Sequence, residues 1–228
     1  MKKKLLGAFA LTGLLCLTAC GSKENSAKKA FYNAYNFTDV ENYTTETKAY
    51  YNGELTSVTT VERDGIYAKA TISYVQNPES EYLKDQIAYY VLDFDNDYLA
   101  LFLYEDNEYT KESTLSTAEV KEVFNDAKQL ENNLFDKLTY DKEKQTYSAT
   151  GLKYSEIFDL DVSYLDNYSF DYFAQFDDGK VVSVVCEGTY TSTYSTFTSR
   201  TEETITYGTA IVVFPDELLE IIEEDRKN

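Results

Sequence analysis

The residue with the most specific chemical setting in this sequence is Cys20, which ends the tetrad Leu17-Thr18-Ala19-Cys20. An apolar run from Leu5 to Leu17 precedes it, and the three lysines after Met1 give that run a positively charged start. The run has the length of a signal-peptide core and is shorter than the roughly 20 residues that cross a bilayer. The small residues before Cys20 suit a protease cleft, and its thiol is the strong nucleophile at that point of the chain.

This arrangement resembles the lipobox of bacterial lipoprotein precursors. The resemblance implies a diacylglyceryl thioether on Cys20, with fatty acids such as palmitate, and cleavage before that residue. Two or more acyl chains anchor a protein stably, whereas one does not. We therefore expect a removed signal peptide at 1–19, a lipidated cysteine and polar tether at 20–28, and a single β-rich domain at 29–228, held outside the cytoplasm in the cell envelope. An ordinary signal peptide with a chance cysteine is the alternative, and it implies a secreted protein.

The chain contains no histidine, and this narrows the chemistry that the domain can perform. Ser-His-Asp and Cys-His catalysis and the usual imidazole zinc sites are excluded. Carboxylate, Tyr, Lys and Ser chemistry remains, but among 40 acidic side chains a close pair of carboxylates carries little information. We expect no enzymatic activity, no catalytic residues and no cofactor.

One segment has the spacing of a metal-binding loop. Asp93, Asp95 and Asp97 alternate as at the start of an EF-hand, but Tyr98 and Tyr104 stand where such a loop needs Gly and Glu. We interpret the segment as a hairpin turn and predict no metal site, with a weak calcium site as the alternative.

Cysteine usage excludes an internal disulfide bond. If Cys16 leaves with the signal peptide and Cys20 carries lipid, Cys186 remains alone. It ends the apolar run Val181–Cys186, which has the pattern of a strand, and we predict that it lies in the core.

The charge balance is strongly acidic, with 21 basic and 40 acidic side chains and a net charge of −19. Without the first 19 residues, 18 basic side chains face 40 acidic ones and the net charge is −22. Such a field repels nucleic acid and anionic lipid headgroups. The expected partners are a membrane, through the lipid on Cys20, and an amphiphile or a surface partner; nucleic acid is not expected.

The domain after the tether is predicted to consist mainly of antiparallel strands. Asn52-Gly53 and Asp64-Gly65 are hairpin signals, because both positions of such a turn tolerate positive φ. Alternating apolar residues mark the strands. The predicted strands are Tyr43–Tyr51, Glu54–Arg63, Ile66–Val75, Ile87–Phe94, Tyr98–Tyr104, Phe135–Tyr140, Gln145–Ala149, Tyr168–Phe176, Val181–Tyr190 and Thr204–Phe214, with Thr189–Thr198 either a polar strand or a loop.

Helices are predicted where apolar residues recur at intervals of three and four. They are expected at Ser26–Phe37, at Thr117–Asn132 after a capping box, at Tyr154–Leu160, and from Pro215 onward, where Leu218, Leu219, Ile221 and Ile222 are apolar. The helix Thr117–Asn132 is the predicted cover of the sheet.

Two predicted strands, Ile87–Phe94 and Tyr98–Tyr104, are apolar on both faces. In the second, three leucines alternate with Tyr, Ala and Phe. A strand that is buried on both sides needs a cover on each, and helices, a curled sheet or a ligand can supply the second one. The candidate ligand-binding residues are therefore Tyr90, Leu92, Leu99, Leu101, Phe102, Leu103 and Phe124.

The order of these elements resembles the half-barrel of bacterial periplasmic lipoprotein carriers and mycobacterial glycolipid-binding lipoproteins. The resemblance covers most of residues 26–222. It implies an α+β, mostly antiparallel β fold: a curled sheet or half-barrel of about ten to eleven strands, lidded by two or three helices, with acyl chains between. The expected function is a non-catalytic binding module for an amphiphile in that space. The alternative is a structural or interaction protein of the cell surface, whose exposed Tyr-rich strands bind protein or glycan; the chain has 22 Tyr.

Overall fold

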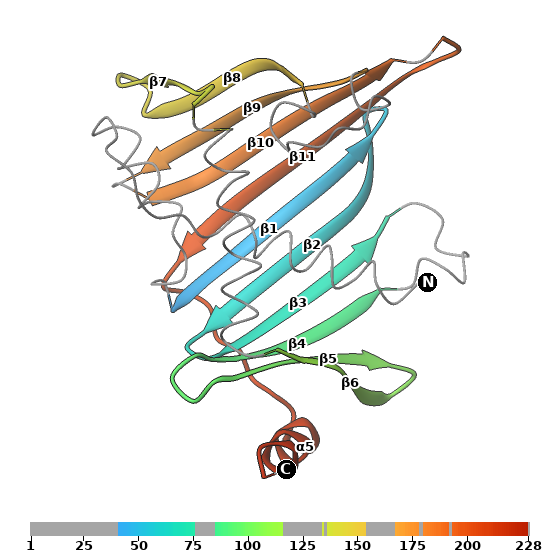
Figure 1. Cartoon of the computed structure of the whole chain (residues 1–228), viewed down its shortest axis with the longest axis vertical. Helices are drawn as coiled ribbons and strands as arrows, with labels where there is room; N and C mark the ends of the chain where they lie inside the picture. Colours follow the sequence, from blue (N-terminus) through green and yellow to red (C-terminus); the bar gives the residue numbers. More distant parts are fainter. Residues whose placement is uncertain are drawn as a thin grey trace.

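The structure of the chain is a computed structural model that describes residues 41–75, 85–115, 134, 136–153, 167–177, 180–191 and 193–227. Its main element is one sheet of eleven strands (Figure 1). The strands are β1 Asn42–Tyr51, β2 Glu54–Asp64, β3 Tyr67–Tyr74, β4 Gln86–Asp93, β5 Tyr98–Glu105, β6 Glu108–Leu115, β7 Thr139–Asp141, β8 Thr146–Lys153, β9 Tyr168–Asp177, β10 Lys180–Thr191 and β11 Thr196–Tyr207.

The sheet consists of two meanders joined at their middle. Strands β1 to β6 run outward to one edge, β7 to β11 return from the other edge, and the last strand pairs with the first. Every pairing is antiparallel. Asn52 and Gly53 connect β1 to β2 with φ values of 49° and 82°, as the hairpin signal requires. The predicted antiparallel class and strand number are confirmed.

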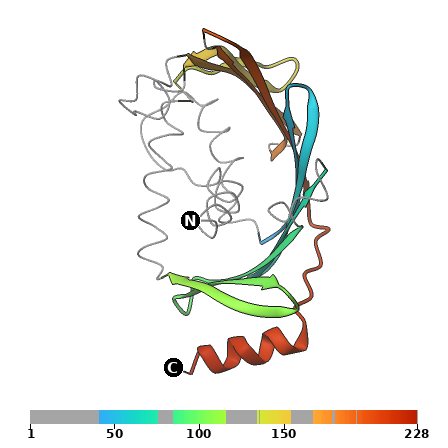
Figure 2. The ribbon, with the colours of Figure 1, turned by 90° about the vertical axis from the view of Figure 1, so that its right-hand side faces the viewer.

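The sheet is curled and open, so it has a concave and a convex face (Figure 2). Register shifts interrupt four strand pairs: β1–β2, β5–β6, β8–β9 and β9–β10. A bulge leaves one residue unpaired, bends its strand and increases the local twist. These shifts are a local cause of the curl, and the unpaired outer sides of β6 and β7 leave the half-barrel open.

Helix α5, Asp216–Asp225, packs on the convex face (Figure 2). Leu218 and Ile222 are its buried residues, and with Phe214 they contact Val91 and Phe102 on the sheet. One of the two covers needed by the two-faced strands is therefore α5, together with the extended segment before it. Among the described elements α5 is the one helix, so the predicted lid of two or three helices is not shown.

Polar contacts fix the end of α5 to the strands beneath it. Lys111 and Tyr98 both donate hydrogen bonds to Asp225, at 2.5 and 2.7 Å. The hydrogen bonds from Lys111 and Tyr98 lower the pKa of the Asp225 carboxyl. Arg226 donates to Asp93 at 2.9 Å, and its guanidinium lies 4.7 Å from the centre of the Tyr98 ring.

Four strands differ from the sequence predictions. Strand β8 continues to Lys153, four residues beyond the predicted Gln145–Ala149. Strand β6 was not predicted, because its sequence EYTKESTL is largely polar and has no apolar alternation. β7 spans only Thr139–Asp141 instead of Phe135–Tyr140. Strand β11 ends at Tyr207, so the predicted closing strand Thr204–Phe214 is wrong over most of its length: the chain leaves the sheet at Gly208, where φ is 75°, and continues without strand structure to α5.

Other predictions fall outside the described residues. These are the helices Ser26–Phe37, Thr117–Asn132 and Tyr154–Leu160, and the lipidation residue Cys20. Within the described ranges, no helix is both long and apolar enough to span a membrane.

Candidate functional site

The concave face of the sheet carries most of the candidate ligand-binding residues. Tyr90 and Leu103 are buried in one apolar cluster, and Leu92 and Leu101 pack against it. Leu99 is buried and pairs with Leu92 across β4 and β5, so it lies on the same face. Five of the seven predicted residues are thus brought together. The other buried members of this cluster are Val61, Ala68, Ala70, Ile72 and Ala88.

The two remaining candidates do not join them. Phe102 is fully buried on the convex face, where it packs with α5, because it alternates with Leu101 and Leu103 along β5. The strand pattern shows that Phe102 faces away from the leucines, but not which face a ligand would use. Phe124 lies outside the described residues.

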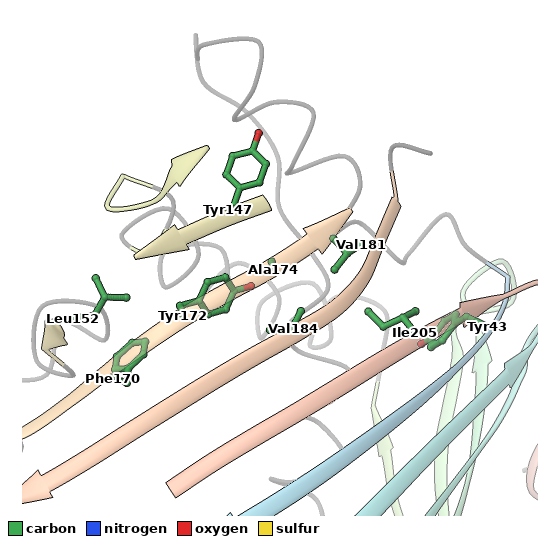
Figure 3. Packing of buried hydrophobic residues seen from close by; sticks show 9 residues of the cluster. All are labelled: Tyr43, Tyr147, Leu152, Phe170, Tyr172, Ala174, Val181, Val184 and Ile205. Atoms are coloured by element: carbon green, nitrogen blue, oxygen red, sulfur yellow. The ribbon is translucent and has the colours of Figure 1, made fainter. Parts of the chain in front are cut away.

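A second apolar cluster occupies the other half of the concave face (Figure 3). It is built by side chains from β1 and from β8 to β11, and the partly buried Cys186 packs against it. Burial raises the pKa of the Cys186 thiol to about 11, which makes it unreactive near neutral pH. The buried residues are Tyr43, Tyr147, Leu152, Phe170, Tyr172, Ala174, Val181, Val184 and Ile205.

A continuous row of buried side chains joins the two clusters across six strands. Strand register places one residue each from β11, β1, β2, β3, β4 and β5 in line. At about 4.8 Å per strand, the row is roughly 24 Å long. The sequence could not reveal it, because it depends on the pairing of β1 with the distant β11. The row, which we call the concave row, is Ile205, Thr45, Val61, Ala70, Ala88 and Leu103, all buried.

The middle of the concave row consists of small side chains. Ala70 and Ala88 are direct neighbours on β3 and β4, and Ala68 lies beside them on β3. All three are almost fully buried although their side chains are the smallest with a Cβ. Larger side chains, Val61 and Leu103, lie at the two ends of this stretch, so the side chains of the concave row are shortest at the alanines. We call this stretch of small side chains, Ala68, Ala70 and Ala88, the trough.

The row beside the concave row carries polar groups. Register aligns Glu203, Thr47 and Thr59 with Ile72 and Gln86. Glu203 is half-buried, and burial raises the pKa of its carboxyl to about 7. The side-chain oxygen of Gln86 is buried and has no hydrogen-bond partner among the described residues.

Tyr90 and Arg63 add polar atoms on the other side of the concave row. The Tyr90 hydroxyl is buried without a hydrogen-bond partner in the described part of the chain, and burial raises its pKa. Arg63 is also buried, but its Nε donates to the Gly65 carbonyl at 3.1 Å. Its guanidinium lies beside Tyr43, where it opposes the rise that burial causes in the Tyr43 pKa, to about 12.

The convex face has a hollow of about 490 Å³ at one end of β1, β10 and β11. Its charged groups satisfy one another: Arg200 forms ion pairs with Glu187 and Glu202, and Tyr50 donates to Glu202 at 3.2 Å. We interpret this network as a surface contact that links three strands, because its polar side chains already have partners.

The aspartate-rich segment forms the predicted turn between β4 and β5. Asp93 accepts hydrogen bonds from the backbone and the side chain of Asn96, at 3.2 and 2.9 Å, and forms an ion pair with Arg226. Within the described residues, no group of three His, Cys, Asp or Glu side chains is placed to hold a metal ion.

Comparison with known proteins gives no match to a family model or to a curated protein. The feature of the described residues that indicates a function is the concave face. That face is elongated and apolar, and it carries a few polar groups at defined positions. Ligand sites in proteins commonly combine these two properties.

Proposed function

We propose that this chain is a membrane-anchored lipoprotein outside the cytoplasm whose domain binds an amphiphile, without catalysis, on the concave face of its sheet. The amphiphile lies along the concave row, with its apolar part against the alanines of β3 and β4. The lipid on Cys20 holds the domain near the membrane from which such a molecule would come.

The observation that carries this proposal is the concave row. A face that only had to pack against a helix would be expected to have large interdigitating side chains. The adjacent alanines instead leave only short side chains over two strands, and the row, apolar except for Thr45, continues for roughly 24 Å. The hydrocarbon layer of one bilayer leaflet is roughly 15 Å thick, so the row is long enough for a lipid acyl chain.

The binding experiment compares two leucine substitutions that are neighbours in sequence. Ala70→Leu fills the trough, whereas Thr71→Leu places the same side chain on the convex face. Both proteins carry Cys20→Ser so that they purify without detergent. We expect dodecanol to displace a fluorescent apolar dye from the Thr71→Leu protein as from the parent, and at least about tenfold more weakly from the Ala70→Leu protein, through overpacking of the trough. Equal affinities in all three proteins would exclude the concave face as the site.

The anchoring part of the proposal has its own experiment. Cys20→Ser removes the acyl acceptor, so we expect the protein to leave the membrane fraction or to be misprocessed, and to incorporate no radiolabelled palmitate. A Cys186→Ser protein is the matched control and should fractionate like the parent. If the Cys20→Ser protein remained membrane-bound and were processed normally, the lipid anchor would be wrong.

A row of aromatic side chains favours a second candidate function, which is binding of a surface partner by Tyr-rich strands. Tyr51 stacks on Phe197, and Phe197 on Tyr190, with ring centres 5.8 and 6.4 Å apart. Tyr51 is 48% exposed. If this row binds glycan, Tyr51→Ala should abolish binding on a glycan array while the affinity for dodecanol is unchanged. A parent protein that binds no glycan would remove this candidate.

A further inference from the structure

Within the described residues, the carboxyl group of Glu203 differs from its neighbours in having no cation beside it. Glu202 and Glu187 both pair with Arg200, and Glu46 pairs with Lys48 at 2.9 Å. Strand alternation puts those three carboxylates on the convex face. Glu203 faces the concave side, as its neighbours Val184 and Ile205 do, and within the described residues it forms neither an ion pair nor a hydrogen bond.

The environment of Glu203 explains why its charge is costly. Its register neighbours are Thr47 on β1 and Val184 on β10, and the buried Ile205 follows on the same face. A carboxylate in such surroundings loses hydration without gaining a counter-charge, and buried charges are otherwise paired.

Among the described residues, the titratable and charged groups that face Glu203 do not supply a cation. Tyr43 and Tyr207 interact electrostatically with Glu203, and both remain neutral because burial raises their pKa. The thiol of Cys186 is neutral for the same reason. Arg63 is on the same face, but it lies two strands and four residues away, which is roughly 16 Å.

We infer that Glu203 binds a positively charged, amine-bearing head group of the amphiphile, whose apolar tail follows the concave row toward Ala70 and Ala88. This inference rests on the proposed function. The charge of the chain supports it, because a net charge of −19 attracts cationic amphiphiles and repels anionic ones. Glu203 adjoins the Ile205 end of the row. The head group of the ligand at Glu203 and its apolar tail on the row would therefore lie next to each other along the face.

The polar atoms at the other end of the face are consistent with an elongated ligand. The Tyr90 hydroxyl and the Gln86 side-chain oxygen are buried and lack partners among the described residues. They lie on β4, four strands from β11. An unpaired buried polar group is costly, so each is available to a second polar group on the ligand.

The experiment compares three probes that share one dodecyl chain and differ in charge: dodecylamine, dodecanol and dodecanoate, below their micellar concentrations. The protein is expressed from its full sequence with Cys20→Ser, and affinities are measured calorimetrically. Dodecylamine stays protonated from about pH 5 to 8.5, as a lysine side chain does. Around pH 8.5 we expect it to bind about tenfold more tightly than dodecanol, with dodecanoate weakest, because a charge-assisted hydrogen bond to Glu203 stabilises it. Near pH 5 Glu203 is protonated, and we expect the preference to fall below about threefold.

Glu203→Gln is the critical variant, and Glu46→Gln is its matched control. Both remove one negative charge, but Glu46 is exposed on the convex side of the neighbouring strand. We expect Glu203→Gln to lose the preference for dodecylamine while it keeps the affinity for dodecanol, and Glu46→Gln to retain both. If the Glu203→Gln protein kept the preference, or the parent bound dodecylamine and dodecanol equally, this inference would be wrong although the proposed function stood. If none of the three probes bound, the proposed function itself would fail.

Discussion

Replacement of Glu203 by glutamine should change how the stability of the protein depends on pH. Burial raises the pKa of this carboxyl from 4.5 to about 7. Between these two values the folded chain keeps a proton that the unfolded chain releases, so the free energy of unfolding falls as the pH rises. Below this window the carboxyl is protonated in both states, and above it the carboxyl is ionised in both states, at full cost to the folded chain.

The size of the effect follows from the two pKa values. At about 1.4 kcal/mol per pKa unit, the rise corresponds to about 3 kcal/mol. The side chain keeps partial contact with water, which screens the charge, so we expect about 2 to 3 kcal/mol. Glutamine has the same shape and no charge, and it should therefore leave stability near pH 4.5 unchanged and raise it by this amount near pH 8.

The assay is urea unfolding of the parent, Glu203→Gln and Glu46→Gln proteins across that range, followed by tyrosine fluorescence. Other carboxyl groups also titrate, so the informative quantity is the difference between each variant and the parent. We expect this difference to grow with pH for Glu203→Gln and to stay within about 0.5 kcal/mol for the exposed Glu46→Gln. Parallel pH profiles for the parent and Glu203→Gln would refute the argument that this carboxyl is buried without a counter-charge.

Three further predictions concern packing and reactivity. Gly188→Ala should lower the free energy of unfolding by about 1 to 2 kcal/mol, because the new Cβ would collide with the Tyr168 side chain and break its 2.7 Å hydrogen bond to Ser199. Unchanged stability in thermal unfolding would contradict this prediction. Leu218→Ala should lower the free energy of unfolding by about 2 to 5 kcal/mol or detach α5, since Leu218 is fully buried against the convex face. Limited proteolysis near α5 distinguishes these two results. A variant as stable and as resistant to protease as the parent would contradict the packing of α5 on the sheet. The Cys186 thiol should react with a disulfide reagent near pH 7 on the order of hundredfold more slowly than a free thiol, as followed by peptide mass spectrometry, and at the ordinary rate in denaturant; rapid reaction in the native protein would show that it is not buried.

The sequence predicted the strands well where local signals are strong. The first hairpin follows from Asn52-Gly53, and the two-faced character of β5 follows from its alternating leucines. Strand β6 escaped prediction because an edge strand with one solvated side needs no apolar pattern. The end of β11 was misplaced because Thr204–Phe214 continues to alternate after the chain has left the sheet at Gly208.

The candidate site was only partly readable from sequence. Tyr90 and the leucines of β5 were found from local alternation, which also set Phe102 on the opposite side. The concave row was not found, because its members come from strands that are far apart in the chain and meet only through the pairing of β1 with β11. Glu203 was missed for a related reason: among 40 acidic residues, what distinguishes it is the absence of a nearby cation among the described residues and the apolar side chains around it.

The most direct test of the central claim is to follow individual alanine methyl groups by NMR during titration with dodecylamine. Ala70 and Ala88 belong to the trough on the concave face, whereas Ala100 is equally buried on the convex face beneath α5 and serves as an internal control. We predict saturable shifts of the Ala70 and Ala88 methyl signals and no shift of the Ala100 signal. Shifts of Ala100 without shifts of Ala70 and Ala88, or no saturable shift in any of them, would contradict amphiphile binding on the concave face.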